Sequence, residues 1–150
     1  MSESRLKDFL DKEHIKYVTI GHSPAYTAQE IAAEAHIPGK ELAKTVVVKI
    51  DGEMAMVVTT ASEMIELDHI RDSLGAKEVD LATENEFKDS FPDCETGAMP
   101  PFGNLYGMKV FVSQTLREDE QIAFNAGTHS ELVRLPYTEF ERLVHPTPLA

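Results

Sequence analysis

The sequence predicts a single α+β domain, residues 1–150, with a mixed, largely antiparallel sheet and flanking helices. Two apolar runs meet at an Asp51-Gly52 pair, which is a strong β-hairpin signal. Helical and strand-like segments then follow one another without the strict alternation that a parallel α/β fold requires. At 150 residues and 42% hydrophobic composition, the chain can bury a core without disulfide or metal staples.

The first elements are a helix, a strand and a capped helix. Apolar side chains within residues 6–10 share one helical face, and residues 17–20 follow as a strand. Thr27 and Glu30 have the spacing of a capping box, so a helix begins there, and we expect it to stop at Pro38-Gly39.

The remaining elements are predicted from hydrophobic periodicity and from the residues that begin or end helices. A second capping box at Thr83–Glu86 begins a helix that carries Phe87 and Phe91 on one face and ends at Pro92. After the terminal helix we expect the tail beyond Val144 to be loosely held. The other predicted elements are strands 45–50, 54–60, 78–81, 108–113, 122–125 and 132–135, and helices 67–74 and around 140–143.

The composition narrows the classes of function. A net charge of −12 argues against extensive wrapping of nucleic acid, because such binders normally carry a basic face. Cys94 is the single cysteine, and the amino-terminal residues have no apolar signal core, so we expect a cytoplasmic protein. No apolar run approaches the roughly 20 residues of a membrane span.

Residues 96–107 carry an unusual density of glycine and proline. The glycines permit positive φ or close approach, and Pro100 and Pro101 remove donors and fix φ, so the segment should be rigid. Such a loop can direct backbone N–H groups, above all that of Gly97, at a substrate oxygen. A tight surface crossover between a helix and the next strand is an equally good interpretation.

Lys44 stands at the border of a β-branched strand. A partly desolvated ammonium group keeps its charge by finding an anion, such as a phosphate or carboxylate of a ligand. A surface lysine paired with Glu41 or another acid is the commoner situation.

Four blocks in order resemble one family. They are His22 with Tyr26-Thr27-Ala28, Ala43-Lys44-Thr45 entering a strand, Gly97-x-x-x-Pro101-Phe102-Gly103, and Phe124-Asn125-Ala126-Gly127 before a strand. In order and spacing the chain resembles the YbaK/EbsC, or prolyl-tRNA-synthetase-associated, editing domain family from about His22 to Leu143.

The resemblance implies a trans-editing hydrolase that deacylates mischarged aminoacyl-tRNA at the terminal adenosine. It implies that no protein nucleophile is used and that the 2′-hydroxyl of the adenosine assists. Lys44 and Gly97 are the expected catalytic residues. The expected substrate-binding residues are His22, Tyr26, Thr45, Pro101, Phe102, Gly103, Asn125, Gly127 and His129.

The partners expected on this interpretation are the acceptor end of a mischarged tRNA and an aminoacyl-tRNA synthetase, with no membrane and a monomeric state. We expect no cofactor and no metal, because the histidines lack zinc-ligand spacing and no second cysteine exists. Asp93 and Glu95 should raise the pKa of Cys94, so it is not a candidate nucleophile.

Some alternatives remain open at this stage. His129, in a turn-forming segment, can meet the amino-acid end of a substrate or simply be solvated. His22 can line the pocket or tie Gly21 to Tyr26. The whole chain can instead be a non-catalytic module that binds a synthetase or an aminoacyl-adenosine group. Hydrolysis of a small ester unrelated to tRNA has less support, because no Gly-x-Ser-x-Gly elbow is present.

Overall fold

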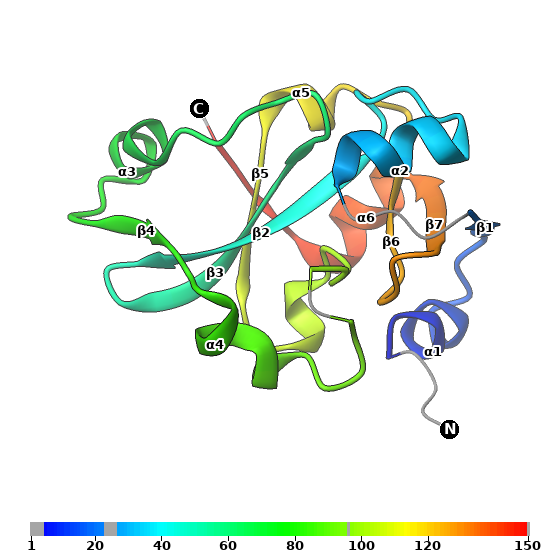
Figure 1. Ribbon diagram of the computed structural model, residues 1–150, viewed down its shortest axis with the longest axis horizontal. Helices are drawn as coiled ribbons and strands as arrows, with labels where there is room; N and C mark the ends of the chain where they lie inside the picture. Colours follow the sequence, from blue (N-terminus) through cyan, green and yellow to red (C-terminus); the bar gives the residue numbers. More distant parts are fainter. Residues whose placement is uncertain (1–4, 23–26, 96, 150) are drawn as a thin grey trace.

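The computed structural model describes residues 5–22, 27–95 and 97–149, and it confirms the α+β class. Its strands form two sheets, with order β4-β2-β3-β5-β8 in the larger and β1-β7-β6 in the smaller (Figure 1). The strands are β1 Val18–Gly21, β2 Ala43–Ile50, β3 Glu53–Thr60, β4 Val79–Leu81, β5 Lys109–Val112, β6 Gln121–Asn125, β7 Glu131–Pro136 and β8 Thr147–Pro148. The helices are α1 Arg5–Lys12, α2 Ala28–Ala35, α3 Leu67–Leu74, α4 Glu84–Phe87, α5 Gln114–Arg117 and α6 Tyr137–Val144, with short 3-10 turns η1 Lys88–Ser90 and η2 Gly103–Leu105.

The predicted hairpin joins β2 and β3. Asp51 and Gly52 both have positive φ, 50° and 89°, which is the pattern of a type I′ turn. The Asp51 carboxylate also accepts hydrogen bonds from the backbone N–H groups of Lys77 and Glu78, at 3.0 and 2.9 Å. The turn is therefore fixed to the start of β4 as well as to its own hairpin.

The main core lies between the two sheets. Alternate residues of β2, β3 and β5 pack there against alternate residues of β6 and β7. Side chains from α1, from α6 and from residues 97–107, which we call the glycine-proline loop, complete this core. The outer face of the smaller sheet is covered by α2, and the outer face of the larger sheet is covered by α3. Figure 1 shows these two helices at opposite ends of the molecule.

The predicted bounds of two helices were wrong. α2 has the expected capping box but ends at Ala35, and His36 closes it in the left-handed region with φ 57°. Pro38 disfavours helical backbone at the residue before it, which explains the early end. α4 also has its capping box, yet it is α-helical only to Phe87 and continues as η1, so Phe91 follows the helix rather than lying on it.

The carboxyl-terminal tail is not loosely held, contrary to the prediction. β8 pairs in parallel with β5, and the Leu149 N–H donates to the Val112 carbonyl at 2.9 Å. Leu149 is only 7% exposed and packs in the cluster beneath α3. A strand of two residues is too short to show an alternation of apolar and polar side chains, so only this tertiary packing specifies it. Across the described residues, no helix is both long enough and apolar enough to cross a bilayer.

Candidate functional site

Residues from four separate parts of the chain line one cavity of about 170 Å³ beside the edge of β2. Four of the residues predicted for the site are among them: Lys44, Thr45, Gly97 and Asn125. The other lining residues are Ile31, Leu42, Ala43 and Val46. Ile31 and Leu42 are each only 2% exposed, so they give the cavity a dry, apolar wall.

Lys44 reaches the cavity from β2. It lies opposite Thr59 of β3, and it is only partly exposed. Its Nζ donates to the backbone carbonyl of Glu63 at 2.6 Å. The Glu63 carboxylate in turn accepts from the Thr60 N–H at 2.8 Å, which fixes the turn that carries this carbonyl.

The ammonium group of Lys44 retains binding capacity. Within the described part of the chain it makes no ion pair, so the predicted alternative of a partner such as Glu41 is not seen there. An ammonium group has three donors, and the Glu63 carbonyl uses one. The remaining donors and the uncompensated positive charge suit an oxygen-rich ligand.

The backbone of β2 is also available at this point. The Val47 carbonyl accepts from the Ala82 N–H, on the side of β2 that faces β4. Because alternate residues of a strand direct their backbone groups to the same edge, the N–H and C=O of Thr45 point the same way. The pairing with β4 begins only at Val48, so the Thr45 groups face the cavity.

Gly97 forms the opposite wall, and its position requires glycine. Its φ is +89°, a region that side chains disfavour. Its N–H donates to the thioether sulfur of Met99 at 3.2 Å, and sulfur is a weak acceptor. The loop is held by Gly127, whose N–H donates to the Ala98 carbonyl at 3.0 Å.

Asn125, at the end of β6, contributes a buried polar atom. Its Oδ1 has no hydrogen-bond partner among the described residues, although it is shielded from solvent. A buried carbonyl oxygen without a donor is uncommon in folded proteins. A ligand N–H or O–H group in the cavity would satisfy it.

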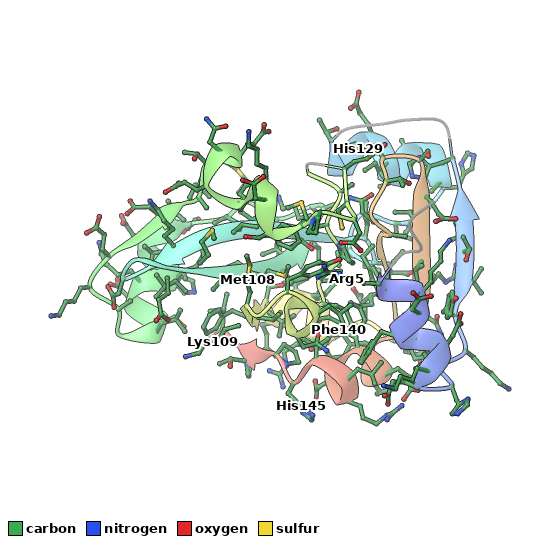
Figure 2. The ribbon with its side chains drawn as sticks, turned by 90° about the horizontal axis from the view of Figure 1, so that it is seen from below. Arg5, Met108, Lys109, His129, Phe140 and His145 are labelled. Carbon is green, nitrogen blue, oxygen red and sulfur yellow. The ribbon has the colours of Figure 1, made fainter. Side chains whose placement is uncertain are left out.

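The two candidate histidines lie near each other at the ends of β1 and β7. The His129 ring lies beside Gly97, since a Cβ added there would be 3.5 Å from His129 Cε1. The His129 N–H donates to Glu95 Oε1 at 2.6 Å, and Figure 2 shows the residue at the β6–β7 turn. The His22 N–H donates to the Ser130 carbonyl at 2.9 Å, which ties β1 to β7. Neither histidine is among the residues that line the cavity.

Pro101, Phe102 and Gly103 were predicted to bind substrate, but they are buried and do not line the cavity. Phe102 is 0% exposed, in the core between the sheets. A Cβ at Gly103 would lie 2.6 Å from the Val110 side chain, so Gly103 is a point of close packing. Gly127 does not line the cavity either, and its N–H holds the loop through the Ala98 carbonyl. Tyr26, which was also predicted to bind substrate, lies outside the described residues.

Cys94 is part of a polar cluster that attaches α1 to the loop. Burial, with a contribution from Asp93, raises the pKa of the Cys94 thiol to about 11. The Tyr106 hydroxyl donates to Asp93 at 3.1 Å, and the Arg5 guanidinium lies over the Tyr106 ring at 5.3 Å. The thiol is therefore protonated near neutral pH. The direction of the pKa shift agrees with the prediction, but its main cause is burial rather than the charges of Asp93 and Glu95. In the described ranges, no group of three or more His, Cys, Asp or Glu side chains could hold a metal ion.

Sequence reasoning did not assign the other four lining residues to this site, nor Glu63, which contacts Lys44. Ile31 and Leu42 form its apolar wall, and Glu63 supplies the carbonyl that Lys44 contacts. Ile31 is predictable as a core residue of a capped helix, but nothing in the sequence indicates that it borders a cavity. Every residue has a backbone carbonyl, so the sequence does not indicate that Lys44 contacts the one of Glu63.

This fold is found in proteins of known structure. The chain matches the crystal structure of hypothetical protein APE2540 with a TM-score of 0.83 and 19% identity, over 95% of each chain. It matches a protein described as a candidate trans-editing enzyme for prolyl tRNA synthetase with a TM-score of 0.81 and 20% identity, over 99% of this chain and 96% of that one. At such identity these structures show the fold alone. No curated protein matches the sequence.

The family follows from the sequence itself. The model of the aminoacyl-tRNA editing domain matches residues 22–143, which is most of the chain. The protein therefore belongs to the aminoacyl-tRNA editing domain family, and the resemblance noted from its four sequence blocks is confirmed.

Proposed function

We propose that this protein hydrolyses the ester bond of a mischarged aminoacyl-tRNA, with the aminoacyl group in the cavity between Lys44 and Gly97. The supporting observation is that two features line the same cavity: a half-buried ammonium group that makes no ion pair with the described residues, and a positive-φ glycine. Membership of the editing domain family supports the reaction class.

The cavity volume favours a small amino acid. About 170 Å³ is below the roughly 300–1,000 Å³ of pockets that enclose drug-sized ligands. The aminoacyl group would enter, with its side chain toward Ile31 and Leu42, and the adenosine would stay at the mouth. The Asn125 Oδ1 would accept a hydrogen bond from the α-amino group.

The proposed chemistry uses water as the nucleophile. Water attacks the ester carbonyl carbon, the bond to the ribose oxygen breaks, and that oxygen leaves as a hydroxyl with a proton from the water. Lys44 stabilises the negative charge that develops on the substrate oxygens. The Gly97 N–H exchanges the weak Met99 sulfur acceptor for a substrate oxygen, which is a stronger one.

The test is a deacylation assay on tRNAs mischarged with alanine, cysteine, serine or threonine. Lys44→Met keeps most of the length of the side chain and removes its charge, and we expect its kcat/KM to fall by about a hundredfold or more, as for loss of one oxyanion donor. Lys109→Met is the matched control, because Lys109 is an exposed strand lysine outside the cavity, and its kcat/KM should stay near the wild-type value.

Circular dichroism would establish that both variants are folded. Undiminished turnover by folded Lys44→Met would refute the assigned role of the lysine. Saturable binding of aminoacyl-tRNA without product by the wild-type protein would instead support a non-catalytic binding module.

A further inference from the structure

A second cavity, of about 330 Å³, lies on the α3 side of the larger sheet. Its walls come from β3, the segment leading into α3, α3 itself, the start of α5 and Leu149. In Figure 1 the last described residues of the chain run up between α3 and α5. The cavity shares no lining residue with the one proposed to hold the aminoacyl group.

Thr59 presents a buried, unpartnered hydroxyl group to this second cavity. The residue is only 5% exposed, and its Oγ1 has no hydrogen-bond partner within the described ranges. Buried hydroxyl groups normally have such a partner, because desolvation is otherwise uncompensated. The hydroxyl can accept a hydrogen bond from a ligand in the cavity, where Thr59 is one of the lining residues.

The charged groups of the lining are acidic. Glu63 and Glu66 line the cavity together with His69, and the lining includes no lysine or arginine. The Lys44 ammonium group lies outside the lining, where it donates to the backbone carbonyl of Glu63. The Oε1 atom of Glu63 accepts from the Thr60 N–H and from the Ser113 hydroxyl, both at 2.8 Å, so the carboxylate is held in place. These two bonds leave Oε2 without a donor among the described residues. A fixed carboxylate with one open oxygen is a receptor for a cation with N–H donors.

The rest of the wall is hydrocarbon. Val57, Ile70 and Leu149 are each less than 9% exposed and form the floor. Met64, which is 88% exposed, also belongs to the lining. The unbranched methionine side chain adapts to ligands of different shape. The volume is within the range of small-molecule sites.

We propose that this cavity binds a small primary ammonium ion with an apolar body. The ammonium group donates to Glu63 Oε2 and to Thr59 Oγ1, and the body packs against Val57 and Ile70. The inference does not depend on the deacylase proposal, because it concerns a cavity that shares no lining residue with the first.

The probe is phenethylammonium, titrated into the protein while methyl NMR signals of Val57, Ile65 and Ile70 are followed at about pH 8. At this pH histidine is mostly neutral and a primary alkylammonium is still charged. We expect saturable shifts at these methyl groups. The neutral analogue 2-phenylethanol and the anion phenylacetate should bind about tenfold more weakly or not at all.

Two variants test the contacts. Glu63→Gln removes the charge but keeps an oxygen that can accept from Thr60 and Ser113, so the fold should persist and binding should weaken at least about fivefold. Thr59→Val removes only the buried hydroxyl and should also weaken binding. Glu53→Gln, an exposed position at the start of β3, is the control and should bind like the wild type.

Three outcomes would overturn the proposal. They are no saturable shift up to about 10 mM phenethylammonium, equal affinity for 2-phenylethanol, and undiminished binding by both Glu63→Gln and Thr59→Val. None of them bears on deacylation, so the two proposals fail separately.

Discussion

Phe102 is the residue whose substitution best separates a core role from a substrate-binding role. Its ring is 0% exposed and lies 6.1 Å from the ring of Phe9, 5.4 Å from that of Phe124 and 5.6 Å from that of Phe140. Figure 2 shows Phe140 well inside the molecule. Phe102 therefore connects α1, β6 and α6 in one aromatic cluster.

Replacing Phe102 with alanine should lower the free energy of unfolding by about 3–5 kcal/mol, the usual cost of removing a buried phenylalanine. The loss of three aromatic contacts favours the upper part of this range. Since 1 kcal/mol shifts Tm by roughly 2–4 °C in a chain of this size, Tm should fall by about 6–20 °C. Phe102→Leu keeps most of the volume and should cost about 1–2 kcal/mol.

The assay is urea unfolding of both variants followed by circular dichroism, combined with deacylation per folded molecule at low temperature. On the core interpretation, Phe102→Leu keeps a near-wild-type KM while it loses stability. A variant of unchanged stability with a raised KM would refute this reasoning and restore the substrate-binding role.

Two further predictions concern ionisable groups. With its pKa raised to about 11 by burial, the Cys94 thiol should react with iodoacetamide near pH 8 more than about tenfold slower than free cysteine; an alkylation rate equal to that of free cysteine would contradict the buried setting. Glu86 has its pKa lowered from 4.5 to about 2, first by the Lys49 ammonium and then by the Thr83 N–H of the capping box. A lowered folded-state pKa gives stability that is present above about pH 4.5 and is lost as the pH falls toward 2. Lys49→Met should therefore raise the Glu86 midpoint in an NMR titration, though not fully to 4.5, and an unmoved midpoint would show that the lysine is not the main cause.

The parts of the fold that the sequence predicted well are those specified by short-range chemistry. Asp51-Gly52 sets a type I′ turn whatever surrounds it, and each capping box satisfies helix N–H groups with side chains three residues apart. β8 depends on contacts with distant residues, such as Leu149 with the cluster beneath α3. Contacts of this kind produce no pattern among neighbouring residues of the sequence, so they could not be predicted from it.

The candidate site shows the same division. A lysine at a strand border and a glycine among prolines are unusual, which indicates Lys44 and Gly97 as site residues, and both line one cavity. The same motif contains Phe102 and Gly103, but sequence spacing does not say which side of a loop faces the core. Asn125 belongs to a matching sequence block, and only the structure shows that its buried Oδ1 has no donor among the described residues.

The glycine-proline loop links the stability of the protein to its candidate site. Phe102 anchors the loop in the aromatic cluster, and a Cβ at Gly103 would meet the Val110 side chain at 2.6 Å. Gly97, five residues before Phe102, is exposed at the cavity with φ +89°. Because glycine adopts many backbone conformations readily, the conformation of Gly97 is fixed only by what surrounds it. The buried end of the loop supplies that constraint, so we infer that the prolines and Phe102 act on the site by fixing the direction of the Gly97 N–H rather than by touching a ligand.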